Sequence, residues 1–160
     1  MTDIQFNKDV EEFIHAANNN DLRMLMVGGT AVNYYGYKRH SADIDFWIEP
    51  SEKNFHRLLK TLQEIGYKLD SLPDKVKKAE QNISLKISPD FEIELITNFN
   101  PGKTFEQAFS ESVNIELRKQ QLLKWNVISL HDLISSKTKS GRPKDLLDIQ
   151  ELRRINPDKI

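Results

Sequence analysis

The sequence contains no cysteine. This absence excludes a disulfide scaffold, thiolate catalysis, and any zinc or iron–sulfur site that depends on cysteine ligands. Long apolar runs are also missing, because none approaches the roughly 20 residues that a membrane-spanning helix needs. The first residues show no basic segment followed by an apolar one, the pattern of a secretory signal peptide. We therefore expect a soluble, cytoplasmic protein.

The chain has 160 residues, of which 38% are hydrophobic and 29% are charged. Such a composition is typical of a folded globular protein and not of a disordered one. A chain of this length can bury roughly 70% of the surface of its unfolded state around one core. No internal repeat or linker interrupts it, so we expect one domain that spans residues 1–160.

The net charge of −1 argues against a protein that coats nucleic acid without specificity. Nucleic acid stays a possible partner, although the charge does not indicate it. Seven basic residues and one acid nevertheless lie between residues 118 and 144. They can form a solvated surface with cations near a helix C-terminus, or a wall that faces phosphates. The charge pattern alone slightly favours the solvated surface.

Apolar periodicity and capping residues predict an alternation of helices and strands. This order favours a mixed sheet with helices packed on it, in the α/β or α+β class. The motif core of the domain is expected within residues 24–96, and a helical C-terminal part within 129–156. Strands are predicted at Met24–Val27, Asp43–Ile48, Ile83–Ile87, Phe91–Ile96 and within Gln121–Ile128; helices at Val10–Ala17, Thr30–Tyr35, Ser51–Ile65, Thr104–Phe109, Ser129–Ser140 and from Pro143 onward.

Two acids stand out in the predicted strand Asp43–Ile48. Side chains two apart on a strand share a face, so the Cα atoms of Asp43 and Asp45 should lie about 6.6 Å apart along it. Two carboxylates at that separation can hold a pair of hard divalent cations. The alternative is an ordinary half-exposed strand with polar residues outward, although aspartate is disfavoured in strands. The two aspartates alone do not favour the metal site over the ordinary half-exposed strand.

Trp47 is predicted on the same face as these two acids. It can line a cleft and stack on a nucleobase, or it can pack beneath a loop. The sequence leaves both interpretations open.

Gly28 and Gly29 follow an apolar strand and precede a predicted helix. Glycines there allow close approach of the backbone to a ligand, and the N–H groups at a helix start attract phosphate. The pair matches neither a P-loop nor the dinucleotide-binding fingerprint. By itself it could equally be a tight turn between strand and helix.

The combination of these features is more specific than its parts. Val27-Gly28-Gly29, thirteen further residues, and then Asp43-Ile-Asp-Phe46 resembles the signature of the DNA polymerase β-like nucleotidyltransferase superfamily. The approach Arg39-His-Ser-Ala-Asp43 is similar to the Arg-x-Thr-x-Asp of many members, with Ser41 where threonine is usual. The resemblance implies the polymerase β-like fold, a mixed sheet flanked by helices in a single nucleotidyltransferase domain.

That superfamily completes its metal site with a third carboxylate from a neighbouring strand. In Phe91–Ile96, Glu92 and Glu94 share the face opposite the apolar residues. Glu94, followed by Leu-Ile-Thr, resembles the acidic residue of the family better than Glu92 does. Many members have aspartate here, so glutamate is a departure. We favour Glu94, and both acids could instead be simply solvent-facing.

The resemblance continues into the C-terminal half, and it covers roughly residues 24–152. The segments 104–108 and 127–134, Lys137, and Gly141-Arg-Pro-Lys-Asp-Leu-Leu-Asp-Ile149 are similar to small bacterial proteins of this fold. These are relatives of enzymes in toxin–antitoxin and phage-defence systems and of lincosamide-type nucleotidyltransferases. The analogy implies that Lys137 approaches the nucleotide phosphates and that Asp145 orients it. An exposed helix lysine and an acid that complements a helix dipole are the alternatives.

Three further positions complete the nucleotide-binding set implied by the resemblance. Thr30 follows the two glycines. Arg39 could contact the triphosphate or the acceptor, and Arg142 could bind phosphate or act as a structural anchor.

The resemblance implies a metal-dependent nucleotidyltransferase. Asp43, Asp45 and Glu94 would bind Mg²⁺ or Mn²⁺, with a nucleoside triphosphate, expected to be ATP, as substrate. The acceptor would be a hydroxyl of a protein, an RNA end or a small molecule, attacking the α-phosphorus and releasing pyrophosphate. Two alternatives stay open: an antitoxin-like interaction module that binds and neutralises a partner toxin, and a degenerate fold that only binds nucleotide.

Overall fold

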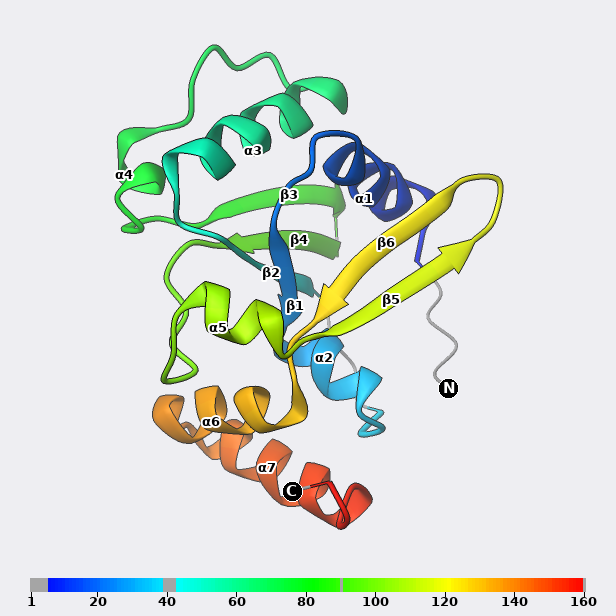
Figure 1. Ribbon diagram of the computed structural model, residues 1–160, viewed down its shortest axis with the longest axis vertical. Coiled ribbons are helices and arrows are strands. Elements are labelled where there is room, and N and C mark those ends of the chain that lie inside the picture. Colours follow the sequence, from blue (N-terminus) through cyan, green and yellow to red (C-terminus); the bar gives the residue numbers. More distant parts are fainter. Residues whose placement is uncertain (1–5, 39–42, 90, 160) are drawn as a thin grey trace.

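A mixed six-stranded sheet forms the centre of the protein, as the computed structural model in Figure 1 shows. The structure describes residues 6–38, 43–89 and 91–159. The strands are β1 (Met24–Val27), β2 (Asp43–Ile48), β3 (Ile83–Ser88), β4 (Phe91–Ile96), β5 (Val113–Arg118) and β6 (Leu122–Val127). The helices are α1 (Lys8–Asn19), α2 (Gly28–Tyr34), α3 (Glu52–Glu64), α4 (Asp74–Lys77), α5 (Phe105–Ser110), α6 (Leu130–Ser140) and α7 (Pro143–Ile155).

The strands lie in the order β3-β4-β2-β1-β6-β5. β2 runs parallel to β4, and β1 runs parallel to β6, whereas the other neighbouring pairs are antiparallel. The predicted mixed sheet with flanking helices is therefore confirmed. Because β2 lies between β4 and β1, its side chains have neighbours on both sides along the sheet.

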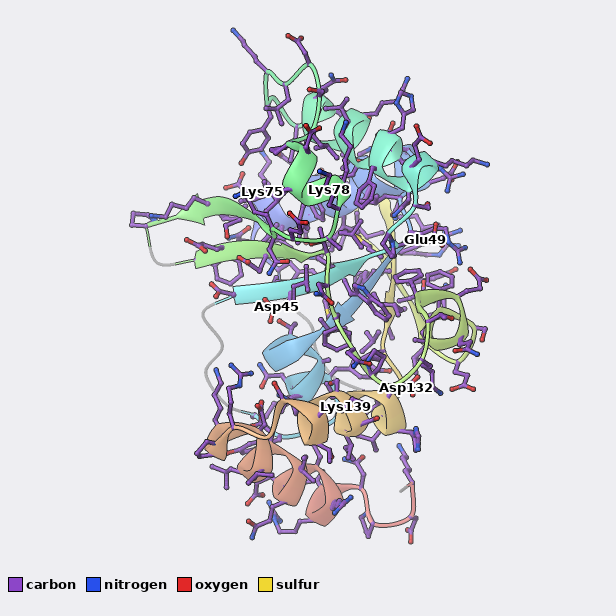
Figure 2. The ribbon with its side chains drawn as sticks, turned by 90° about the vertical axis from the view of Figure 1, so that its left-hand side faces the viewer. Asp45, Glu49, Lys75, Lys78, Asp132 and Lys139 are labelled. Carbon is purple, nitrogen blue, oxygen red and sulfur yellow. The ribbon has the colours of Figure 1, made fainter. Side chains whose placement is uncertain are left out.

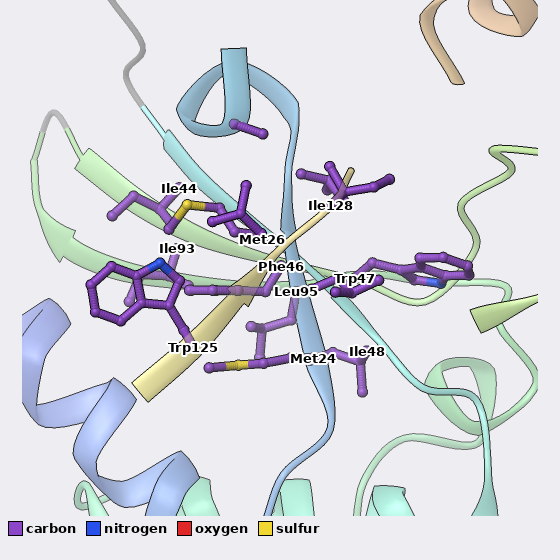
Figure 3. Packing of buried hydrophobic residues seen from close by; sticks show 14 of the residues in the cluster. Met24, Met26, Ile44, Phe46, Trp47, Ile48, Ile93, Leu95, Trp125 and Ile128 are labelled. Atoms are coloured by element: carbon purple, nitrogen blue, oxygen red, sulfur yellow. The ribbon is translucent and has the colours of Figure 1, made fainter. Parts of the chain in front are cut away.

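The alternation of residues along β2 gives the sheet two different faces. Ile44, Phe46 and Ile48 are buried, as predicted for a core-facing set. Phe46 packs against Phe13 of α1, with ring centroids 5.9 Å apart. α1 and α3 contact each other on this side of the sheet (Figure 1), and Figure 3 shows the apolar side chains of β1, β2, β4 and β6 that meet in the core.

Several helix boundaries follow from the capping residues that the sequence supplies. The hydroxyl of Ser51 accepts a hydrogen bond from the N–H of Asn54 at the start of α3. Thr104 and Gln107 form a reciprocal capping box at the start of α5. Gly141 ends α6 in the left-handed conformation, with φ of +64°.

Only one half of a capping box forms at the N-terminus of α6. Ser129 accepts from the N–H of Asp132, but the Asp132 carboxylate does not return to the cap as a capping box requires. It lies instead 2.9 Å from the Lys103 ammonium, and the Asp132 side chain is completely buried. The Lys103 ammonium compensates the charge of this buried carboxylate, which would be costly without a partner.

Two further elements differ from the sequence-based expectation. β5 was not predicted, and it forms an antiparallel hairpin with β6 in which Ile115 lies opposite Trp125. α2 begins at Gly28 and not at Thr30, so both glycines belong to the helix. The two glycines therefore form its first turn.

α2 contacts β2 on the sheet side away from α1, and α6 and α7 pair with each other at that end of the molecule (Figure 1). In the part of the chain that the structure describes, no helix combines the length and the apolar character needed to cross a bilayer.

Candidate active site

Four carboxylates project from one face of two adjacent parallel strands. Asp45 of β2 lies in register with Glu94 of β4, and Asp43 lies in register with Glu92. Neighbouring strands are about 4.8 Å apart, so each pair of acids lies side by side. Figure 2 shows Asp45 projecting from β2 toward α2 and the α6–α7 pair. The parallel pairing of β2 and β4 thus gathers acids that are about fifty residues apart in the sequence.

The edge strand β3 distinguishes the two glutamates. Ser84 lies opposite Glu94, and its hydroxyl donates to Glu94 Oε2. Lys86 lies opposite Glu92, where its charge can offset that of the glutamate. Glu94 is therefore the acid next to Asp45, whereas Glu92 has a cation across the strand pair.

The first residue of α2 packs directly against Asp45. Gly28 has φ of +64°, a conformation that side-chain-bearing residues rarely adopt. A Cβ atom added to Gly28 would overlap Asp45 Oδ2 and lie 3.0 Å from Asp45 Cγ. The glycine is thus required both by the backbone turn and by the carboxylate that lies against it.

The concentration of acids changes the chemistry of Asp45. Burial raises the pKa of Asp45 to about 6, and the nearby charges of Asp43 and Glu94 add to this increase. The charges of Lys137 and Lys144 act in the opposite direction. The protonation of Asp45 therefore depends both on the neighbouring carboxylates of the sheet and on the cations Lys137 and Lys144 of the α6–α7 region.

Of two further predicted nucleotide-binding residues, Thr30 lies within the described residues and Arg39 does not. The Thr30 hydroxyl donates to the backbone carbonyl of Asp43 at 3.2 Å, which ties α2 to the start of β2. Arg39 lies outside the described residues, as does the segment 40–42 that leads into β2. The role of Arg39 therefore stays a prediction.

Lys137, on α6, is buried among acids of α7. Its ammonium lies 2.8 Å from Asp148 Oδ2 and 3.5 Å from Asp145 Oδ1. The Lys137 side chain is 9% exposed, and those of Asp145 and Asp148 are 1% and 2% exposed. Lys137 is therefore an internal cation of the α6–α7 pair and not the exposed lysine that one interpretation of the sequence expected.

Asp145 serves mainly the start of α7. It accepts from the Arg142 Nε at 2.8 Å and from the Arg142 backbone N–H at 3.2 Å, which closes a reciprocal cap. Burial alone would raise the pKa of Asp145, but the hydrogen bond from Arg142 and the charge of Lys137 outweigh burial and lower it. The Arg142 side chain, 58% exposed, is anchored at its Nε by this carboxylate.

Asp148 was missed by the sequence analysis, although it is the acid nearest the Lys137 ammonium. Asp145 and Asp148 are three residues apart, so they share one face of α7. Two acids on the otherwise apolar face of a predicted helix were the signal that could have identified a buried ion-pair partner.

Trp47 is in the core and 4% exposed. Its ring centroid lies 5.1 Å from that of Phe99 and 4.9 Å from that of Phe105. Phe99 belongs to the segment between β4 and α5. The indole therefore packs beneath this segment, in agreement with one of the two interpretations of the sequence.

The four carboxylates are neighbours on the sheet, but they do not form a complete metal-coordination site. Within the ranges that the structure describes, no three histidine, aspartate or glutamate side chains are gathered in a group that could hold a metal ion. The four acids thus lie on one face of β2 and β4, as neighbours on adjacent strands.

The sequence matches a protein family over residues 5–156, and that family is described as Nucleotidyltransferase of unknown function (DUF6036). The chain belongs to this family. It is therefore an enzyme of the nucleotidyltransferase class, whose general chemistry is the transfer of a nucleoside monophosphate. No curated protein gave a significant match to the sequence.

A similar solved structure agrees with this family. It is the crystal structure of lincosamide antibiotic adenylyltransferase LnuA, lincomycin-bound, with a TM-score of 0.51 and 16% sequence identity. The similarity covers 94% of this nucleotidyltransferase and 98% of the other chain. At this identity the match shows the fold, and the predicted nucleotidyltransferase fold is confirmed.

Proposed function

We propose that this nucleotidyltransferase uses a divalent-metal complex of ATP and transfers the nucleoside monophosphate to an acceptor hydroxyl. One observation carries the proposal most directly: the Asp45 carboxylate lies between Glu94 on the adjacent strand and Gly28 at the first turn of α2. This arrangement supports the proposal, because the acids proposed as metal ligands lie beside a backbone turn that a phosphate could approach.

The chemistry of these acids suits a hard divalent cation, although their side chains are not gathered around one point in the described structure. Asp43, Asp45 and Glu94 supply only carboxylate oxygens, which Mg²⁺ and Mn²⁺ prefer. Burial raises the pKa of Asp45, the charges of Asp43 and Glu94 raise it further, and a bound cation would offset that repulsion. When bound, the metal would supply charge for the triphosphate and activate the acceptor hydroxyl.

Residues of the chain itself would bind the phosphates and accept the proton. Gly28 and Gly29, with Thr30 after them, offer a turn that lets phosphate oxygens approach the backbone. Lys137 and Arg142 supply positive charge from the α6–α7 side. The acceptor oxygen attacks the α-phosphorus in line, and the bond between the α-phosphorus and the leaving pyrophosphate breaks. A carboxylate accepts the proton of the acceptor hydroxyl. Asp45 or Glu94 would be the carboxylate that accepts this proton.

The test supplies each α-³²P-labelled nucleoside triphosphate, with Mg²⁺ or Mn²⁺, to the protein in cell extract. The wild type is compared with Asp43→Ala/Asp45→Ala and with Glu80→Ala, an exposed acid of the 78–82 segment. We expect transfer of label with ATP by the wild type and by Glu80→Ala only. The labelled species then identifies the acceptor as a protein, an RNA end or a small molecule.

Equal labelling by the Asp43→Ala/Asp45→Ala variant would remove the two aspartates from the mechanism. The interaction-module alternative makes a different prediction, because neutralisation of a partner toxin by binding does not need these carboxylates. Loss of transfer together with unchanged neutralisation of a partner by the double variant would therefore favour that alternative.

A further inference from the structure

One row of residues crosses four neighbouring strands of the sheet through the candidate active site. Ser84 of β3 lies opposite Glu94 of β4, and Glu94 lies in register with Asp45 of β2. Asp45 in turn lies opposite Val27, the last residue of β1, and Gly28 follows Val27. The row therefore runs from a hydroxyl, past two of the acids proposed to bind the metal, to the glycine turn.

Ser84 is the exposed hydroxyl at one end of this row. β3 is an edge strand of the described sheet, and the Ser84 side chain lies on the face that carries the acids. Its Oγ donates a hydrogen bond to Glu94 Oε2 over 2.5 Å, a distance typical of a hydroxyl bound to a charged carboxylate. A hydroxyl within hydrogen-bond reach of a carboxylate that can take its proton is the arrangement of an activated nucleophile.

The order of groups along the row matches what displacement at phosphorus requires. The attacking and leaving oxygens lie on opposite sides of the phosphorus. The proposed function places the leaving pyrophosphate at the turn of Gly28 and Gly29, so the attacking hydroxyl must come from the other end of the row, where Ser84 lies. The Thr30 hydroxyl does not suit this role, because it lies on the glycine side and donates to the carbonyl of Asp43.

We propose that Ser84 is a site of self-nucleotidylation, at which the protein transfers the nucleoside monophosphate of its bound MgATP to its own strand β3. Ser84 Oγ forms a bond to the α-phosphorus, the bond from that phosphorus to the pyrophosphate oxygen breaks, and the hydroxyl proton passes to Glu94. The products are a phosphodiester of Ser84 and pyrophosphate. The inference rests on the proposed function, and it names a hydroxyl of the chain itself as an acceptor.

The position of Ser84 on the same sheet as the acids implies transfer within one molecule. Ser84 and Asp45 are two strand spacings apart, about 10 Å between Cα atoms, and Glu94 between them contacts the hydroxyl directly. No second copy of the chain is needed to bring this acceptor to the site. The fraction of chains labelled per unit time should therefore not depend on protein concentration.

The experiment incubates the purified full chain with Mg²⁺ and α-³²P-labelled ATP, without extract, and locates the adduct by mass spectrometry of peptides. We expect one adenylate per chain, on Ser84. Ser84→Ala should lose the label, whereas Ser84→Thr, which keeps a hydroxyl on the strand, should retain it. Ser110→Ala is the matched control and should be labelled like the wild type, because Ser110 is exposed on α5 and its hydroxyl donates to the carbonyl of Gln107.

Equilibrium binding of MgATP distinguishes a nucleophile from a residue that only orients Glu94. Loss of the Ser84 hydroxyl removes the acceptor and leaves the acids in place, so Ser84→Ala should bind MgATP like the wild type. Loss of MgATP binding together with the label would show that Ser84 serves only to orient Glu94, and would overturn the inference.

A mixture of two variants tests whether the transfer occurs within one molecule. Ser84→Ala supplies the acids, and Asp43→Ala/Asp45→Ala supplies an unchanged Ser84. Neither variant should be labelled in the mixture. Label on Ser84 of the Asp43→Ala/Asp45→Ala chain would show transfer between molecules and would contradict the inference.

The two proposals fail in different ways. Transfer of label to a species of the extract, with no label on Ser84 of the purified chain, would overturn this inference and leave the proposed function standing. Label on another residue of the chain would do the same. Absence of transfer to any acceptor, with or without extract, would overturn the proposed function, and this inference with it.

Discussion

Gly28 at the first turn of α2 lies against the carboxylate of Asp45 on β2, in the space where any larger residue would place its Cβ atom. The close packing joins the two motifs that the sequence presents fifteen residues apart. It also explains why the first of the two glycines is constrained twice, by a positive φ and by the neighbouring acid.

Replacement of this glycine should affect both stability and nucleotide binding. Gly28→Ala should lower the free energy of unfolding by about 2–4 kcal/mol, from left-handed strain plus overlap with Asp45. Gly66→Ala is the matched control, because Gly66 also has a positive φ, of +106°, but its added Cβ meets nothing within 4 Å. The control should cost about 1 kcal/mol and keep full MgATP affinity. Urea unfolding measures the stability of the two variants, and ATP titration measures their affinity. Equal losses of stability and affinity in Gly28→Ala and Gly66→Ala would contradict a role for the contact with Asp45.

The third carboxylate can be assigned by comparison of the two glutamates of β4. Glu94→Gln should reduce transfer of label at least about 100-fold, because it removes a ligand next to Asp45. Glu92→Gln should have less than about a fivefold effect, since Glu92 faces Lys86 across the hairpin. Initial rates at several Mg²⁺ concentrations provide the measurement. A larger effect at Glu92 would reassign the ligand to that position.

The charge of Asp45 should destabilise the metal-free protein at neutral pH. The folded state raises the pKa of this group from 3.8 to about 6, so it binds a proton more tightly than the unfolded chain does. This contribution to stability therefore increases as pH falls from about 6 toward 4. Asp45→Asn should melt roughly 2–6 °C above the wild type at pH 7.5, and the difference should shrink at pH 5.

Thermal melting without divalent ions at both pH values tests this linkage. The variant Glu80→Gln, at an exposed acid, should melt like the wild type at each pH. A gain in melting temperature of Asp45→Asn that is the same at pH 5 and pH 7.5 would show that the effect does not come from titration of Asp45. Mg²⁺ should reduce the gain, because it stabilises the charged carboxylate.

Trp47 should contribute to folding and not to base recognition. Its ring is buried between Phe99 and Phe105, so Trp47→Ala should cost about 3–5 kcal/mol of unfolding free energy. Trp47→Phe should keep most of the packing and bind MgATP like the wild type. Loss of affinity in a folded Trp47→Phe protein, with adenosine and ATP weakened alike, would instead support stacking on the base.

Local rules predicted much of the fold because they act within one or two turns of the chain. The caps at Ser51 and Thr104 and the glycine at 141 mark helix boundaries by hydrogen bonds and a conformation available to each residue locally. β5 escaped prediction because its alternate residues are half-buried and exposed, with only Val113, Ile115 and Leu117 as apolar positions. Its strand conformation depends on pairing with β6, which a short window of sequence does not reveal.

The sequence by itself determined the two faces of β2, since alternation along a strand puts Asp43 and Asp45 opposite the apolar core residues. It also determined that a glycine turn precedes these acids. Only the tertiary structure decided that Glu94 stands beside Asp45 and that Asp148 stands nearest to Lys137. Strand register and helix packing are set by contacts between distant segments, and several acids of suitable spacing compete for each position until those contacts form.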